Sequence, residues 1–361
     1  MSEPPERRPR AHRAGPIYET LLLVAPARTI PAASACRPCS ARPVGYPAAM
    51  RYVWTLVTLL LAGSTQSQAD ESLVEPKSFS STTPEMSFEE FVGVLRTHID
   101  ALPFERHAVE YSAFLTRHAF EDSAELRAEY HRIAILFEMT RDGGPWKLRW
   151  DITNEEPSSK KIWAQWRDKL DTSATTSATA ECDELSALFG WLASSMGIKK
   201  VGLVWPTSNH TIAAWEPAHA KQKTAATQSR RVLIPTSQIF LSCSATLDQT
   251  SFDPRHGRLG GYPGGDLPKT TRLDSKLTSF LLGAVDVYGG ASPALLSLLR
   301  MHRNTLQSSS TKACQAERAA WAAQIALTPT NLRAMQAYAA DVRWPAMPAS
   351  AMLQKLVAPS R

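Results

Sequence analysis

The sequence predicts an α+β protein in which most of the secondary structure is helical. Apolar residues recur at helical spacing through residues 86–175 and again through residues 273–361. Between these regions, residues 198–234 contain short β-rich runs, in which apolar positions such as Val201, Leu203 and Trp205 alternate with others. Residues 70–361 are numerous enough to bury one large or two small hydrophobic cores.

The first 69 residues carry the signals of an exported protein. Residues 1–49 are rich in Pro and Arg and show no sustained period, which predicts a disordered segment or an extension upstream of the true start. From Met50, a short positive start, an apolar run over 52–62 and a small-residue cleavage site over 67–69 match a secretory signal peptide. The apolar run is too short to span a bilayer. We therefore expect a secreted or periplasmic protein without a stable membrane span after signal removal.

The charge of the chain depends on this leader. The whole sequence has a formal net charge of +6, but residues 1–69 hold eight arginines and three acids. Without them, 32 basic and 31 acidic residues remain. A nearly neutral protein offers no basic stripe to a phosphate backbone, so we do not expect a nucleic-acid partner.

The region after the leader is predicted to be helical. Residues 70–85 are rich in Ser, Thr and Pro, which indicates a linker. Ser87 then caps a helix that has Glu89 and Glu90 in its first turn. Further expected elements are helices over about 108–118, 123–142 and 158–169, a short strand over 146–152, and a loop over 171–179.

The central segment joins a cysteine-bearing helix to a small sheet. Cys182 begins a helix whose apolar face recurs at helical spacing. Thr179 is the expected N-cap, and Gly197 is placed to close the helix in a left-handed conformation. A strand over 198–205, a turn and a second apolar run beginning at His210 follow, and the polar insert over 217–230 is predicted to be a hairpin loop. The helical face consists of Leu185, Leu188, Phe189, Leu192 and Met196.

Cysteine at a helix start and histidine on a nearby strand are suited to nucleophilic catalysis. The helix N-terminus favours the thiolate, and an imidazole can take and return a proton. The backbone N–H groups of the same turn can hold an oxyanion. Glu181, Asp183 and Glu184 oppose this activation, because nearby carboxylates raise the pKa of a thiol.

These residues resemble the transglutaminase-like fold, a papain-like group of acyl-transferring and peptide-cleaving enzymes, over about residues 179–241. The resemblance implies that Cys182 is the nucleophile and His210 the base of a Cys-His-Asp triad. It places Ile234, followed by Pro and Thr, where the family has the Asp. The alternatives for the third member are Thr236, Gln238, Asp248, Asp253 and Asp266. Asp253 is our first choice, in a long Gly- and Pro-rich loop over 250–271 that is also long enough to act as a lid.

Tryptophan is concentrated near this motif, with seven of the ten residues between positions 146 and 215. Trp163, Trp205 and Trp215 are candidate substrate-binding residues of an aromatic cleft. The alternative is that they pack in the core between the helices and the sheet.

The remaining features concern the C-terminal region and cofactors. Cys243 and Cys314 are the expected disulfide pair of an exported chain, which leaves Cys182 free; the alternative is that all three cysteines are buried thiols. We find no phosphate-binding glycine loop and no paired-histidine metal motif in the sequence, so no cofactor or metal is expected. The C-terminal helices are expected over about 276–288, 293–306, 310–327, 331–342 and 349–357.

The predicted architecture divides the chain into a leader (1–49 and 50–69), a linker (70–85), an N-terminal helical region (86–175), a transglutaminase-like core (176–272) and a C-terminal helical region (273–361). The predicted function is exported, thiol-dependent acyl transfer or hydrolysis at an amide bond of a peptide, protein or cell-wall substrate. One alternative is a binding or scaffold protein that keeps the fold and lacks the triad Asp. Another is a mainly helical protein in which the Cys–His pair is coincidental.

Overall fold

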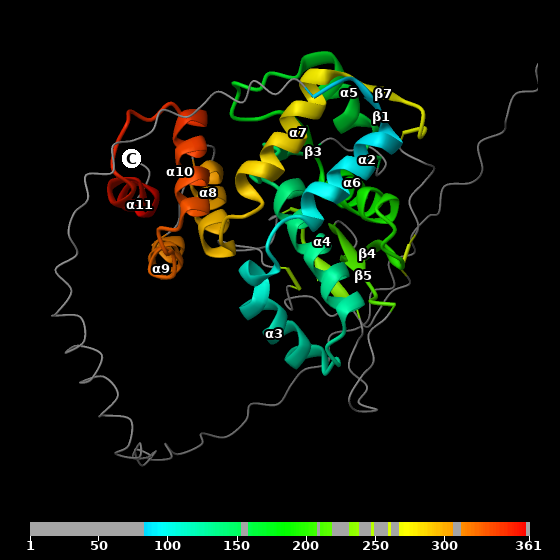
Figure 1. Ribbon diagram of the computed structural model, residues 1–361, viewed down its shortest axis with the longest axis horizontal. Coiled ribbons are helices and arrows are strands. Elements are labelled where there is room, and N and C mark those ends of the chain that lie inside the picture. The colour runs from blue at the N-terminus through cyan, green and yellow to red at the C-terminus, as the bar shows by residue number, and fades with distance from the viewer. Residues whose placement is uncertain are drawn as a thin grey trace, which may run out of the picture. The chain divides into compact units, whose positions relative to one another are not determined.

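The computed structural model describes residues 83–152, 158–207, 210–218, 231–237, 247–248, 259–260, 267–305 and 312–358. The chain divides into Met1–Asp70 and Glu71–Arg361, and every described residue belongs to the second unit. These residues form an α+β fold, as predicted (Figure 1). Among them, no helix has the length and apolar character needed to cross a membrane.

The N-terminal helices follow the predicted pattern closely. Ser87 accepts a hydrogen bond from the backbone N–H of Glu90, whose carboxylate accepts one from Ser87, so the first helix has a complete capping box. Ser123 caps the longest helix, which lies in the core and is buried along most of its length. The elements are α2 (Phe88–Asp100), the 3₁₀ turn η2 (Phe104–His107), α3 (Ala108–His118) and α4 (Ala124–Thr140).

A two-stranded parallel sheet precedes the cysteine-bearing helix and corrects one expectation. β2 (Leu148–Trp150) pairs with β3 (Ala178–Ala180), so Thr179 lies in a strand rather than capping the helix, and Glu181 is the N-cap. Gln165 of α5 (Lys160–Lys169) holds this strand, donating to the carbonyl of Thr179 at 2.7 Å and accepting from its N–H at 2.9 Å. β3 was not predicted, because it is a strand by virtue of its pairing with β2 and not of a local sequence pattern.

The central sheet is antiparallel, with the strand order β4-β5-β6. It consists of β4 (Val201–Thr207), β5 (His210–Trp215) and β6 (Val232–Ile234), and α6 (Cys182–Ser195) packs against it. Alternate side chains along β6 and the paired part of β5 point to opposite faces of the sheet. The face toward the main core includes Ala213, Trp215, Val232 and Ile234. The other face carries a separate small cluster of Val204, Ile212, Ala214 and Leu233.

Part of the predicted long loop lies along the edge of this sheet. Gly260 pairs with Leu203 of β4 through two backbone hydrogen bonds of 2.8 and 3.0 Å. A Cβ atom on Gly202 would come within 2.4 Å of the carbonyl oxygen of Gly260, so this close approach requires glycine. Most residues of this predicted lid loop, Asp253 among them, lie outside the described part of the chain.

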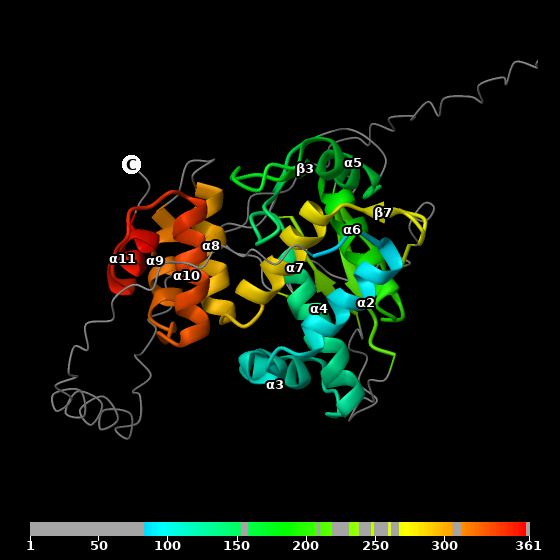
Figure 2. The same ribbon diagram turned by 45° about the horizontal axis from the view of Figure 1, so that its top comes forward.

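The C-terminal helices complete the fold. The N-terminal β1 (Met86–Ser87) pairs with β7 (Arg272–Leu273), which leads into α7. α8 packs against α9 and α11, while α10 contacts α7, α8 and α11, as Figures 1 and 2 show. All five helices were predicted, with ends that differ by a few residues: α7 (Ser275–Tyr288), α8 (Pro293–Thr305), α9 (Lys312–Ala322), α10 (Pro329–Asp341) and α11 (Ala349–Val357).

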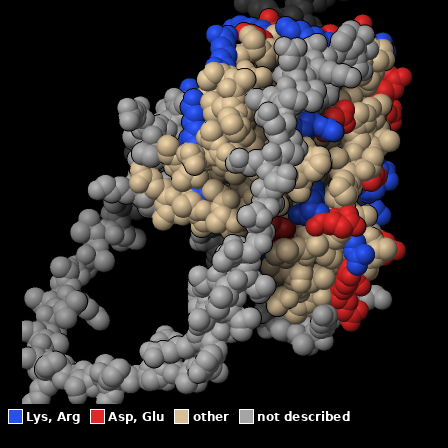
Figure 3. All heavy atoms as spheres, turned by 60° about the vertical axis from the view of Figure 1, so that its left-hand side comes forward, with Lys and Arg blue, Asp and Glu red and all other residues tan. Residues whose placement is uncertain are grey.

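Charged side chains of both signs are interspersed on the molecular face drawn in Figure 3. Exposed ion pairs among the described residues include Arg272 with Glu85 at 3.0 Å and Lys269 with Glu89 at 3.0 Å. On the described residues of that face, basic side chains do not form a continuous stripe.

Candidate functional site

Cys182 is the first residue of α6 and is only 7% exposed. Burial raises the pKa of its thiol, and the charges of Asp183 and Glu181 raise it further. The backbone N–H groups of Thr211 and Asp183 act in the opposite direction and lower it. The balance is a thiol that ionises less readily than an exposed cysteine. The sulfur therefore lies beside the start of β5, and its surroundings do not lower the pKa of the thiol.

Carboxylates already occupy part of this helix N-terminus. Glu184 is fully buried and accepts a hydrogen bond from the N–H of Glu181 at 2.8 Å. It also forms an ion pair with Lys161 at 2.9 Å. Asp183 accepts the N–H of Glu184 at 2.8 Å, and burial raises the pKa of Asp183 to about 6. Some of the backbone N–H groups that an oxyanion would need are therefore already hydrogen-bonded to the carboxylates of Asp183 and Glu184.

His210 is the first residue of β5, pairs with Thr207 and is 2% exposed. Burial lowers its pKa to about 4, so the imidazole is neutral at pH 7. The register between β4 and β5 shifts between Val204 and Thr207, so the regular alternation of side chains holds from Ile212 to Trp215 and is interrupted before it. The backbone N–H of Thr211 lies beside the sulfur of Cys182, and its carbonyl lies 3.4 Å from the hydroxyl of Ser186 on α6.

The structure also locates the residues considered for the third triad position. Ile234 pairs with Ala213 and is a fully buried core residue. Thr236 is buried, and its hydroxyl lies 2.9 Å from that of Ser186 on α6. Asp248 binds Arg117 at 2.6 Å and His118 at 2.8 Å, so its carboxylate is engaged away from His210. Gln238, Asp253, Asp266 and Cys243 lie outside the described residues, as does the side chain of Cys314.

The three candidate tryptophans differ in their surroundings. Trp163 is 4% exposed and packs edge-on against Phe88 and Trp166 in the main core. Trp215 is fully buried, and its ring stacks on that of Phe114. Only Trp205 of the three has a largely accessible ring, which is 48% exposed. Trp163 and Trp215 therefore pack in the core, which was the alternative to an aromatic cleft.

No family model, curated protein or solved structure matches this chain. The resemblance to the transglutaminase-like fold consequently rests on the motif residues around Cys182 and His210, and function has to be argued from the sites themselves.

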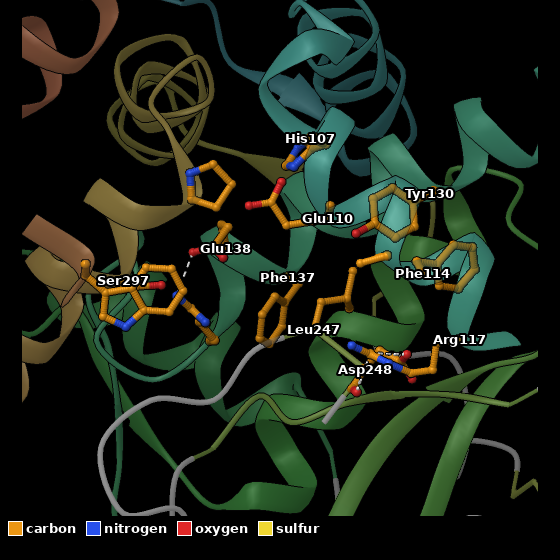
Figure 4. Close-up of a pocket in the computed structure, with 15 residues that line it drawn as sticks. His107, Glu110, Phe114, Arg117, Tyr130, Phe137, Glu138, Leu247, Asp248 and Ser297 are labelled. Atoms are coloured by element: carbon orange, nitrogen blue, oxygen red, sulfur yellow. Dashed lines mark hydrogen bonds and ion pairs between the residues drawn. The ribbon is translucent and has the colours of Figure 1, made fainter. Parts of the chain in front are cut away.

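A second candidate site is a cavity of about 210 Å³ that sequence reasoning did not find (Figure 4). η2, α3, α4, α8 and α9 form its walls, together with Leu247 and Asp248. Its lining combines aromatic rings with charged groups, a composition typical of binding pockets. The aromatic residues are Phe114, Tyr130, Phe137 and Trp321, and the polar ones include His107, Glu110, Arg117, Glu138, Arg141 and Ser297.

The charged groups of this cavity are organised around α4. Glu138 and Arg141 lie one turn apart and form an ion pair of 2.8 Å, and Arg141 also stacks over the ring of Phe137. His107 is 3% exposed, and its pKa is held well below the ordinary value by burial and, secondarily, by Arg106. The cavity thus contains a neutral imidazole beside a buried ion pair.

The sequence contained one signal of this site. Glu138 and Arg141 interrupt an apolar helix face, and buried charges are uncommon unless they are paired or functional. Their partners come from distant segments, so spacing could not reveal the cavity. Among the described residues, no three His, Cys, Asp or Glu side chains are grouped so as to hold a metal ion.

Proposed function

We propose that this chain is an exported ligand-binding protein in which a transglutaminase-like core serves as a scaffold and Cys182 is a buried structural thiol. One observation carries the proposal: carboxylates of Glu181, Asp183 and Glu184 occupy the backbone N–H groups at the start of α6, where an oxyanion would bind, and the thiol of Cys182 is buried beside them.

The electrostatics of Cys182 and His210 support this reading. A thiol whose pKa is raised is mostly protonated at neutral pH, whereas an activated cysteine needs a lowered pKa. The low pKa of His210 makes it a weak base. Ile234, at the position where the resembled family has its Asp, offers no acceptor to fix the imidazole tautomer.

The cavity supports the binding part of the proposal. Aromatic and charged groups from η2, α3, α4 and α9 converge on it, and its volume suits a small molecule or one side chain of a larger partner. The cavity lies among helices that do not carry Cys182 or His210, so binding there would not require the thiol.

Alkylation of the native protein tests the proposal. Iodoacetamide labelling of Cys182, followed across pH 6–10 by mass spectrometry of its peptide, is expected to be slow, with an apparent pKa above the ordinary thiol value of about 8.5. The same chain in urea is the control and should label at the rate of an exposed thiol. Rapid labelling of native Cys182 at neutral pH would contradict the proposal.

Thiol-dependent acyl transfer or hydrolysis at an amide bond is the second candidate. It is favoured by the backbone N–H of Thr211, which acts on the sulfur from the strand beside it. A labelled peptide, protein or cell-wall fragment library would be turned over by the wild-type chain and not by Cys182→Ala if this candidate is correct. Equal turnover, or none, by both proteins excludes it.

A further inference from the structure

We infer that the cavity lined by η2, α3, α4, α8 and α9 binds a primary ammonium group on an apolar stem, and that Glu110, Glu138 and Tyr130 hold the ammonium. This ligand class rests on the binding function proposed for the chain and adds the chemistry that the cavity recognises. It follows from acceptor oxygens of the lining that the described residues leave without a donor, and from the charges around them.

Tyr130 provides the observation that points to a ligand. The residue is 3% exposed and lines the cavity, and Figure 4 shows its hydroxyl directed into that space. Among the described residues this hydroxyl has no hydrogen-bond partner, while burial and, secondarily, the charges of Glu110 and Asp248 raise its pKa. A buried hydroxyl without a partner is costly, so its position favours a ligand that supplies one.

Glu110 supplies a charge at the mouth of the cavity. The residue is exposed on α3, yet its side chain lines the cavity, where desolvation raises the pKa of the carboxyl. The charge of Arg106 lowers that pKa, but in the described part of the chain the two groups form no ion pair, and Arg106 does not line the cavity. A ligand that enters from solvent therefore meets an unpaired carboxylate.

Glu138 brings a second carboxylate to the same space. Its negative charge raises the pKa of Glu110, so the two groups repel each other. The Oε2 atom of Glu138 pairs with Arg141 at 2.8 Å, and its Oε1 atom has no hydrogen bond among the described residues. Glu110, Glu138 and Tyr130 thus offer three acceptors, which matches the three N–H donors of an ammonium group.

The charges of the lining favour a cation over an anion. Arg117 is already paired with Asp248 at 2.6 Å. Arg141 is engaged by Glu138, as described above. His107 adds no positive charge at neutral pH, because burial holds its pKa well below the ordinary value. The lining therefore carries three acidic groups against two basic ones.

Charged groups behind the lining do not reverse this balance. Arg106 and Arg300 do not line the cavity. Asp142 and Glu317 act on Arg300 from the same region and raise its pKa. When these four groups are included, five acids stand against four arginines, so the surroundings keep one excess negative charge.

Aromatic rings are placed to hold the apolar stem. The rings of Phe114 and Tyr130 lie 4.9 Å apart and form a continuous wall, and Trp321 lines the cavity as well. Ring faces attract cations, and the guanidinium of Arg141 already lies 4.7 Å from the centre of the Phe137 ring. The volume of about 210 Å³ exceeds what a single water molecule needs and leaves room for a short amine.

Binding of simple amines to the full chain tests the inference. Calorimetric titration and thermal unfolding would be measured with benzylammonium chloride and with Nα-acetyl-lysine methylamide, each against sodium chloride of equal ionic strength. Benzyl alcohol, which is neutral and of similar shape, is the matched control ligand. We expect benzylammonium to bind saturably, to raise the melting temperature, and to bind at least about tenfold more tightly than benzyl alcohol.

The second amine distinguishes the two sources of an ammonium group. Binding of benzylammonium alone identifies a free amine as the ligand. Binding of the blocked lysine as well identifies a lysine side chain of a peptide, because its backbone is then tolerated at the mouth of the cavity.

Three variants make the test specific. Glu110→Gln should weaken amine binding about tenfold or more, the loss expected for a charge-assisted hydrogen bond. Tyr130→Phe should weaken it about threefold or more, and without ligand it should melt no lower than the wild type, since its hydroxyl has no partner to lose. Glu121→Gln, at an exposed acid that does not line the cavity, should bind like the wild type.

The outcomes separate this inference from the proposed function. Equal binding of benzyl alcohol and benzylammonium, or full amine binding by both Glu110→Gln and Tyr130→Phe, overturns the inference but leaves a binding protein. An absence of binding by both amines also overturns it. Rapid alkylation of native Cys182 would reject the proposed function, whatever the amine results. If Glu110→Gln fails to fold, Tyr130→Phe still decides.

Discussion

Ser186 of α6 and Thr236, which follows β6, are joined by a hydrogen bond of 2.9 Å between their hydroxyl oxygens. Both residues are buried, and Ser186 also makes a 3.4 Å contact to the carbonyl of Thr211. The bond joins the cysteine-bearing helix to the end of the sheet. It involves Thr236, one of the candidates for the third triad position beside His210. Thr236 thus connects helix and sheet, and its hydroxyl is committed to that contact.

Removal of either hydroxyl should destabilise the protein. Ser186→Ala and Thr236→Val each leave a buried hydroxyl without this partner, so each should lower the free energy of unfolding by about 1–2 kcal/mol. The double variant should cost less than the sum of the two, because both partners are then gone. Urea unfolding measures all four proteins, and strictly additive losses would show that the two groups do not interact.

Asp248 is expected to hold the segment 247–248 onto α3. Its carboxylate binds Arg117 and His118, its N–H donates to the carbonyl of Leu233, and its φ is +64°. Asp248→Asn keeps a residue type that tolerates a left-handed conformation but removes the charge. The free energy of unfolding should fall by about 3 kcal/mol, since Arg117 loses its counter-charge and His118 loses a charged hydrogen-bond partner. Asp286→Asn, at a half-exposed pair with His98, is the control and should cost less than about 1 kcal/mol. Equal losses at the two sites would contradict the structure.

Asp183 should make the protein less stable as the pH rises. Its pKa is raised from 3.8 to about 6, mainly by burial, so its contribution to stability is present below pH 3.8 and is lost as the pH rises through 6. Asp183→Asn should therefore melt like the wild type near pH 4 and higher than the wild type above pH 6. It should also lower the thiol pKa of Cys182. A difference in melting temperature that is independent of pH would refute the assignment.

His210 should have the opposite pH dependence. Burial lowers its pKa from 6.5 to about 4, so its contribution to stability is present above pH 6.5 and is lost as the pH falls through 4. His210→Gln, which cannot be protonated, should reduce the acid-induced loss of unfolding free energy by about 2 kcal/mol over this interval. His302, whose pKa is also lowered to about 4, should retain its own share of the effect. Chemical denaturation at several pH values measures the difference. If the variant and the wild type show the same dependence of the unfolding free energy on pH, His210 is solvated and the assignment is wrong.

Most of the helices could be predicted from local sequence. Helical spacing, the Ser87 and Ser123 caps and the Gly197 terminus act within one or two turns, so the sequence alone contains the necessary information. The strands β3 and β7 are two or three residues long and exist because of their partners. Local propensity is too weak to define such strands. Thr179 was therefore assigned to the wrong element.

The sequence by itself determined the order of the elements, the α+β class and the placement of a cysteine at a helix start before a β-rich histidine. Only the tertiary structure decided which part of β5 meets the start of α6, where the backbone N–H of Thr211 lies beside the sulfur of Cys182. It alone also brought Arg106, Glu138 and Arg300 into one charge cluster. The reason is physical: spacing along the chain acts over a few residues, whereas burial and charge depend on which distant segments meet.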